Sequence, residues 1–337
     1  MSADQRVADR ADVAEPVLRR WWRRLPDRLD RRVVVAAWVS FAVQVLLVAT
    51  GGAVRLTSSG LGCPTWPLCT PDSLVSTPEM GVHGLIEFGN RTLAGVVGVA
   101  AVVVLLLVVR VRRERRDLAL LAGTVVLGVV AQALVGGVTV LTGLNPFVVG
   151  FHYVASVALA CVCAAFLLRL RVVPADDGTG RAPAAFRAVT AVLVATAVVT
   201  ILLGVLTTGA GPHSGDLQAG RNGFDATLLQ HVHAWPSYVL VAVTAALTVV
   251  AWVRRMPVRG WLLALLALEG VQVLLGLYQA RHGLPVLAVG AHIVLATLLA
   301  AATTVVALCV GGYGPGRSLH VPARSDVVRR GARGSVR

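Results

Sequence analysis

Residues 118–168 read LALLAGTVVLGVVAQALVGGVTVLTGLNPFVVGFHYVASVALACVCAAFLL and contain no Asp, Glu, Lys or Arg. A helix needs about 20 apolar residues to cross the hydrocarbon core of a bilayer, so this stretch is long enough to cross twice. Because hydrocarbon offers no partners to backbone N–H and C=O groups, each crossing has to be an α-helix. We therefore expect two transmembrane helices here, at Leu118–Leu141 and Val148–Leu168.

The rest of the chain has a similar composition. Of its 337 residues, 56% are hydrophobic and 14% are charged, and the mean hydropathy is +0.75. Soluble domains carry about 25% charged residues, so an ordinary soluble protein is excluded. The predicted fold class is an all-α integral membrane protein with eight transmembrane helices. The six further spans are Val33–Gly52, His83–Val109, Ala188–Thr207, Leu228–Val253, Gly260–Ala280 and Leu287–Val310.

The charges are distributed unevenly over the predicted loops. All 31 basic residues are Arg, the net charge is +14, and 27 of the Arg residues fall in the two termini and in every second loop. The positive-inside rule then predicts a multi-pass protein of the cell membrane with both termini in the cytoplasm. The Arg stretches favour contacts with anionic membrane lipids. No nucleic-acid partner is expected, because few aromatic residues interleave the Arg runs as stacking platforms.

The two halves of the chain repeat one another at an offset of 140 residues. Because four helices return the chain to the same side, the halves are expected to be two parallel four-helix repeats about an axis along the membrane normal. The matched residues are Gln132, Gly136, Gly143, Leu144, Val149, Gly150, His152, Leu159 and Ala160, paired with Gln272, Gly276, Gly283, Leu284, Val289, Gly290, His292, Leu299 and Ala300. The predicted divisions are a cytoplasmic Arg-rich tail (1–32), an N-terminal bundle (33–170), a cytoplasmic linker (171–187), a C-terminal bundle (188–310) and a cytoplasmic tail (311–337).

Histidines lie about one turn inside the outer ends of three predicted helices. His152 and His292 match in the repeat, and His231 and His233 lie near the start of the sixth helix. A single His at such a position is often only an interfacial hydrogen-bonding residue, but ionisable residues within a membrane favour a functional interpretation. Two imidazoles from neighbouring helices of a bundle can hold heme iron axially. We therefore predict iron ligands at His152, His233 and His292, with His231 as an alternative to His233.

The two predicted sites differ in one ligand. When Glu87 is matched with Gln230, Asn90 falls opposite His233. An amide oxygen is a poor ligand for heme iron. The C-terminal half is therefore expected to hold a six-coordinate heme permanently. The N-terminal half, with His152 and Asn90, is expected to have a weaker or open position that suits a bound substrate.

The sequence also suggests roles for two intramembrane carboxylates and one pair of cysteines. Glu87 shares a helix face with Asn90, and it is either functional or a partner of a nearby Arg. Glu269, near the middle of the seventh span, is predicted to serve packing or a proton path. Cys63 and Cys69 lie six residues apart in the first outer loop, where a disulfide is favoured and a metal site is the rival interpretation.

Several of these motifs resemble those of the heme A synthase family. Residues 52–57 (GAVRLT) and 59–69 (SGLGCPTWPLC) are similar to the first outer loop of that family, and residues 86–91 (IEFGNR) are similar to its second-helix motif. The resemblance extends over Val33 to Val310 and includes the repeat-paired helices with His152 and His292. It departs at Asn90, where the family usually has a His, and His83 is the nearest substitute.

The resemblance implies oxidation of the C8 methyl group of heme O to the formyl group of heme A, for the assembly of cytochrome c oxidase. It implies a heme b cofactor (an iron porphyrin) in the C-terminal half and heme O as the substrate in the N-terminal half, with heme O synthase and cytochrome oxidase assembly factors as candidate partners. The implied residues are Glu87 for catalysis, His233, His292 and His231 around the cofactor, and His152, Asn90, Arg55 and Arg91 around the substrate, where the two Arg residues either pair with heme propionates or anchor the interface.

Two other functions remain open at this point. A diheme b-type membrane cytochrome that exchanges electrons with quinone needs four good ligands, which Asn90 disfavours. A transporter is favoured by the parallel repeat, but it does not need a layer of histidines.

Overall fold

The computed structural model describes residues 25–172 and 181–313; the predictions for residues 1–24, 173–180 and 314–337 lie outside this part. Eight helices in the described part are long and apolar enough to cross a membrane, which confirms the predicted all-α membrane fold class. The helices are α3 (Arg31–Leu56), α4 (Gly81–Val108), α5 (Arg116–Leu141), α6 (Pro146–Arg171), α7 (Ala184–Ala210), α8 (Ala226–Val253), α9 (Arg259–Arg281) and α10 (Val286–Val310), and the short 3₁₀ helix η1 (Pro78–Met80) precedes α4.

Capping residues define several of the helix ends. Asp30, Asn145 and Asp225 precede α3, α6 and α8, and their side chains accept hydrogen bonds from backbone N–H groups of the first turn. Such caps satisfy N–H groups that have no partner within the helix. The helices therefore extend a few residues beyond the predicted apolar spans, because the caps and the Arg-bearing turns lie outside the purely apolar segments.

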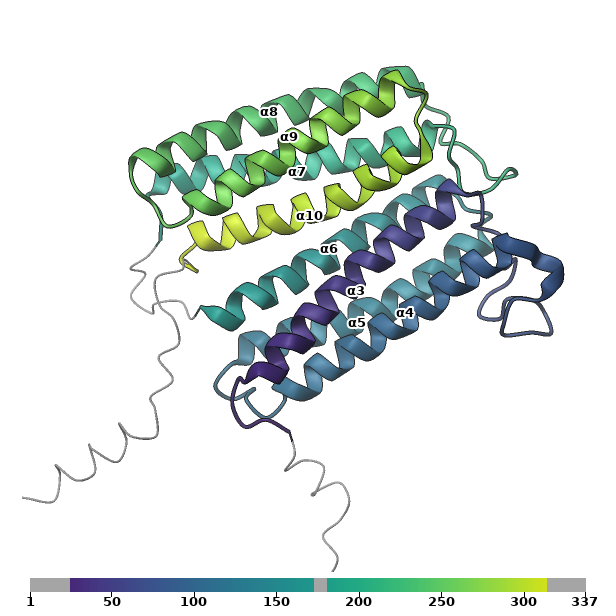
Figure 1. Cartoon of the computed structure of the whole chain (residues 1–337), viewed down its shortest axis with the longest axis horizontal. Coiled ribbons are helices and arrows are strands. Elements are labelled where there is room, and N and C mark those ends of the chain that lie inside the picture. Colours follow the sequence, from purple (N-terminus) through teal and green to yellow (C-terminus); the bar gives the residue numbers. More distant parts are fainter. Residues whose placement is uncertain (1–24, 173–180, 314–337) are drawn as a thin grey trace, which may run out of the picture.

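The eight helices form two neighbouring groups of four (Figure 1). Helices α3–α6 form one group and α7–α10 the other, and α10 packs against both α6 and α3. The loops after α5 and α9 contain the same unusual backbone: Leu144 and Leu284 both have φ of 58°, each preceded by a glycine at positive φ. These matching turns agree with the 140-residue offset. The relation of the two whole groups by one axis stays a prediction.

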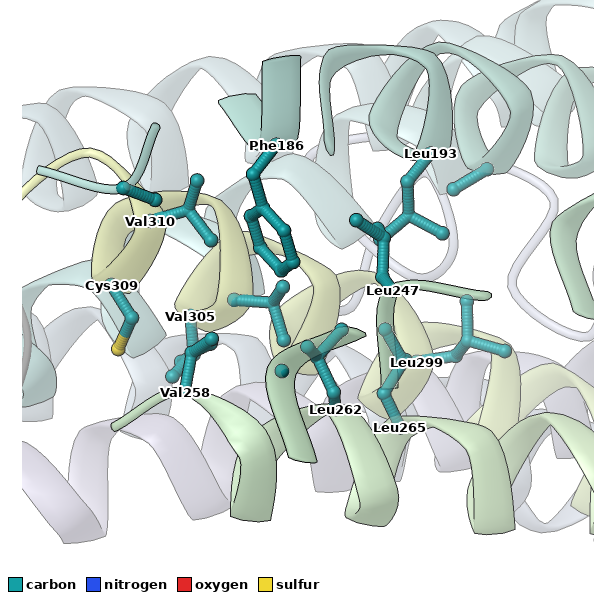
Figure 2. Packing of buried hydrophobic residues seen from close by; sticks show 14 of the residues in the cluster. Phe186, Leu193, Leu247, Val258, Leu262, Leu265, Leu299, Val305, Cys309 and Val310 are labelled. Atoms are coloured by element: carbon teal, nitrogen blue, oxygen red, sulfur yellow. The ribbon is translucent and has the colours of Figure 1, made fainter. Parts of the chain in front are cut away.

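The hydrophobic cores of both groups are concentrated at the end that carries the Arg-rich loops. Figure 2 shows this packing in the second group, where Phe186, Leu247, Leu262 and Val305 interdigitate. In α10, the buried clusters of the described residues begin at Leu299 and continue toward the helix end. The opposite end, which carries the Cys63–Cys69 loop and is called the disulfide end below, contains the predicted site residues.

Candidate functional site

His233 and His292 lie together between α8 and α10 at the disulfide end. Their ring centroids are 6.4 Å apart and their planes are 79° apart. His233 Nδ1 lies 2.9 Å from the Thr200 carbonyl oxygen. Because a carbonyl oxygen can only accept, Nδ1 must carry the proton, and the neutral imidazole keeps a free lone pair on Nε2. This is the tautomer that a metal ligand requires.

The spacing of the two rings fits a shared metal ion. A metal–imidazole bond is about 2 Å and the ring centroid lies about 1 Å behind the bonded nitrogen, so two imidazoles on opposite sides of one ion have centroids roughly 6 Å apart. Glycines bring both rings close to the neighbouring backbones. A Cβ atom at Gly204 would lie 2.8 Å from His233 Cε1, and one at Gly276 would lie 3.4 Å from His292 Cε1. The 6.4 Å separation therefore fits two imidazoles that would hold one metal ion between them, as in a heme site.

His231 is not part of this pair. It is exposed, and its Nδ1 donates to the Thr227 carbonyl of its own helix at 2.8 Å. Residues two positions apart on a helix point in nearly opposite directions. Of the two neighbouring histidines, the structure therefore brings only His233 to His292.

His152 has matching surroundings in the N-terminal half. It lies six residues after the first residue of α6, as His292 does in α10. A Cβ atom at Gly136 would lie 3.4 Å from His152 Cε1. Gln132 Nε2 donates to the His152 carbonyl at 2.7 Å, and Gln272 Nε2 donates to the His292 carbonyl at 3.0 Å. Both histidines therefore have a glycine neighbour and a glutamine that braces the backbone.

Asn90 and its repeat partner His233 are each held by a hydrogen bond to a threonine of the preceding long helix. Thr50 Oγ1 donates to Asn90 Oδ1 at 2.7 Å, whereas the carbonyl of Thr200 accepts from His233. Thr50 and Thr200 are 150 residues apart and occupy equivalent positions in α3 and α7. No hydrogen bond joins Asn90 to His152 among the described residues. The N-terminal half therefore presents one imidazole and one amide.

The Cys63–Cys69 segment, called the disulfide loop, covers the end of the N-terminal half. Cys63 and Cys69 form a disulfide and both are fully buried, which confirms the favoured interpretation. Trp66, within the loop, lies directly on α5: a Cβ atom at Gly137 would be 2.5 Å from the Trp66 ring. Only glycine leaves room for this contact.

Gly137→Val should displace Trp66 and lower stability by about 1–3 kcal/mol, the usual cost of overpacking. Gly123→Val is the matched control on the same helix, because no atom lies within 4 Å of a Cβ atom placed there. The free energy of unfolding of both variants, measured in mixed micelles, would give the difference. Equal stability of the two variants would contradict the close contact.

Glu87 and Arg91 fasten the disulfide loop to α4. Glu87 is 5% exposed; its Oε1 accepts from Arg91 Nη2 at 2.6 Å and its Oε2 accepts from the Cys63 N–H at 2.7 Å. Arg91 also donates to the carbonyl oxygens of Cys63, Thr65 and Leu68 at 2.9, 3.0 and 3.2 Å. A planar guanidinium can satisfy this many acceptors at once.

These contacts bear on two sequence predictions. The pairing of Glu87 with a nearby Arg is present, and both carboxylate oxygens are engaged. Every guanidinium nitrogen of Arg91 has a protein partner, so Arg91 holds the loop and has no nitrogen left over for a propionate.

His83, the suggested substitute for Asn90, is exposed and bonded through Nδ1 to Ser59 Oγ at 2.9 Å.

Arg55 connects the two halves at the disulfide end. Its Nη2 donates to the Thr208 carbonyl at 3.0 Å, and its Nε is buried without a partner among the described residues. The loops beside it also touch, since the Gly60 N–H donates to the Gly215 carbonyl at 2.8 Å. An unpaired guanidinium N–H at this position can donate a hydrogen bond to a carboxylate.

Sequence reasoning missed Thr50, Thr200 and Gly204. The resemblance of residues 56–58 to residues 206–208, at an offset of 150, could have placed the two threonines opposite one another. The close approach of Gly204 to His233 has no such signal.

Comparison with known proteins identifies the family of this chain. The family model COX15-CtaA, described as cytochrome oxidase assembly protein, matches residues 34–304. A heme A synthase of Lysinibacillus sphaericus is 34% identical over 142 residues, which are 41% of this chain and 44% of that protein. A heme A synthase of Listeria welshimeri is 33% identical over 135 residues (39% of this chain, 42% of that protein), and one of Exiguobacterium sibiricum is 29% identical over 121 residues (36% and 40%). The alignments thus span less than half the length of these relatives, whereas the family match spans most of this chain, and the chain belongs to the COX15-CtaA family of cytochrome oxidase assembly proteins.

Proposed function

We propose that this chain is a heme A synthase that oxidises the C8 methyl group of heme O to a formyl group within the membrane. The observation that carries the proposal is the His233–His292 pair at 6.4 Å, in a chain of this family whose relatives bear that name. The N-terminal half, with one imidazole and the buried Glu87, supports a site for the substrate.

The C-terminal half would hold a b-type heme between His233 and His292. When bound, this heme supplies one-electron transfer, which is chemistry that the side chains of the chain lack. Thr200 fixes the tautomer of His233, and Gln272 fixes the backbone of His292. The bond to Thr200 would orient the His233 ring before the cofactor enters.

In the N-terminal half, His152 would ligate heme O and Arg55 would receive a propionate. Asn90, held by Thr50, would offer the iron only an amide, which is a poor ligand for heme iron. Glu87 has both oxygens engaged by Arg91 and Cys63, so we assign it to stabilising positive charge at the methyl carbon rather than to taking a proton. A carboxylate that is already oriented does this without reorganisation.

The termini and every second loop carry most of the Arg residues and lie on one side of the membrane. By the positive-inside rule, we place this side, with both termini, in the cytoplasm. The sites would then open toward the outer face, where the disulfide loop lies. The N-terminal bundle (33–170) would be the substrate half and the C-terminal bundle (188–310) the cofactor half. Heme O synthase, oxidase assembly factors and anionic lipids are the proposed partners.

The mass of the extracted heme tests the function. Membranes that contain the chain and are supplied with heme O should yield a product heavier by about 14 Da, since one oxygen replaces two hydrogens. Glu87→Gln should reduce product formation by about tenfold or more while both hemes stay bound. A wild-type protein that binds two hemes but leaves heme O unchanged would instead support the diheme cytochrome.

A further inference from the structure

The inward face of α9 carries two polar residues in the middle of the membrane span. Leu262, Leu265, Glu269, Gln272 and Gly276 follow one another at spacings of three and four residues, so they share one face of the helix. Glu269 is 1% exposed. It lies ten residues after the start of α9 and twelve before its end, roughly 15–18 Å from either end.

Both polar side chains have an oxygen without a partner. Thr244, itself 0% exposed, donates its hydroxyl to Glu269 Oε1 at 2.7 Å. Glu269 Oε2 is buried and has no hydrogen-bond partner among the described residues. The same holds for Gln272 Oε1, while Gln272 Nε2 donates to the His292 carbonyl.

Among the described residues, Glu269 forms no salt bridge; the Arg residues of α9 itself lie at the two ends of that helix, and the nearby ionisable groups of α8 and α10 include His233 and His292, toward the disulfide end. The helices packed against α9 are α8 and α10, and neither contains an Asp, Glu, Lys or Arg. An unpaired carboxylate in hydrocarbon is far more costly than the neutral acid. The neutral acid also has a proton to donate, and two unpaired acceptors on one helix face need a donor.

We propose that Glu269 is a protonated carboxylic acid and a positioning residue, whose Oε2–H donates to Gln272 Oε1. Residues three apart on a helix are neighbours, so the two side chains are within reach of each other. Thr244, Glu269 and Gln272 then form one hydrogen-bonded chain that ends on the His292 carbonyl. The effect on the heme ligand rests on the proposed function; the protonation and the chain of bonds do not.

The N-terminal half lacks this acid. At the 140-residue offset, Gln272 corresponds to Gln132 but Glu269 corresponds to Val129. Gln132 instead makes a second bond, to Ser156 Oγ at 2.6 Å. The acid therefore accompanies only the half that contains the complete histidine pair, where a ligand has to be held permanently.

Infrared spectroscopy of the purified full-length protein tests the protonation. At neutral pH, the wild-type spectrum should contain the carbonyl stretch of a buried carboxylic acid, and Glu269→Gln should remove it. Gln272→Leu should move the band to higher wavenumber, because the acid loses its acceptor. The control is Glu114→Gln, since Glu114 is exposed in a loop and should leave the band unchanged. An unchanged band in Glu269→Gln overturns the proposal.

The electron paramagnetic resonance signal of the C-terminal heme tests the positioning. A glutamine at 269 can accept from Thr244 and donate to Gln272, so Glu269→Gln should keep the wild-type signal. Glu269→Val, which introduces the residue of the N-terminal half, should shift it; the variant should fold, because Thr244 keeps the Leu240 carbonyl as an acceptor at 2.9 Å. A wild-type signal in Glu269→Val overturns the positioning role. A wild-type protein without this heme would refute the proposed function and leave the infrared result standing.

Discussion

Replacing His292 or His233 with alanine is expected to strip the proposed b-type heme from a protein that still folds. Each variant removes one of the two imidazoles that would hold the heme iron, and the remaining imidazole would hold it more weakly. Loss of a contact that merely orients a ligand already costs about 10–100-fold in metal affinity, so loss of the ligand itself should cost at least about that much. Heme content per protein, measured as the pyridine hemochrome, should fall accordingly.

His231→Ala is the matched control for this experiment. It removes an imidazole two residues away on the same helix, but that imidazole is exposed and bonded to its own backbone. It should therefore retain the wild-type heme content. A protein that loses its heme in His231→Ala and keeps it in His233→Ala would refute the assignment of ligands.

Arg91→Ala is expected to be the most destabilising change at the disulfide end. It leaves the Glu87 carboxylate buried without its cation and frees the carbonyl oxygens of Cys63, Thr65 and Leu68. Breaking a buried ion pair on one side costs about 3–5 kcal/mol. Unfolding in mixed micelles should show a loss of this size, and limited proteolysis should cut the disulfide loop faster.

Arg221→Ala controls for the loss of an arginine that binds loop carbonyls. Arg221 is exposed and donates to the carbonyls of Pro212 and Ala219, and it has no carboxylate partner among the described residues. Its replacement should cost less than about 1 kcal/mol. Arg91→Lys should remain clearly destabilised, because a single ammonium group cannot reach all the acceptors of a planar guanidinium. Full stability of Arg91→Lys would mean that charge alone fastens the loop.

Much of the fold could be predicted because hydrocarbon imposes a strong constraint on sequence. A long stretch with few or no charged residues, such as 118–168, has few structural options, and the eight helices follow from such stretches. The repeat offset also pairs His152 with His292 in the sequence, and the two histidines have equivalent contacts in the structure. Both contact a glycine and a glutamine at matching positions.

Other parts of the site could not be predicted because they depend on how helices turn toward one another. His231 and His233 are both candidate ligands in the sequence, where the match with Asn90 favours His233. In the structure, the rotation of α8 against α7 and α10 brings only His233 to His292. The role of Arg91 was missed for a different reason. Its acceptors are backbone carbonyls in the disulfide loop. Because every residue type has a backbone carbonyl, the sequence does not show which carbonyls accept a hydrogen bond.

The hydrophobic cores lie at the Arg-rich end, away from the histidines. A bundle whose helices are already packed at one end is expected to hold together without the proposed hemes. The polypeptide can therefore be inserted and assembled first and loaded afterwards. The newly synthesised protein would then be folded in the bilayer before heme binds, so its synthesis need not be timed to that of the porphyrin.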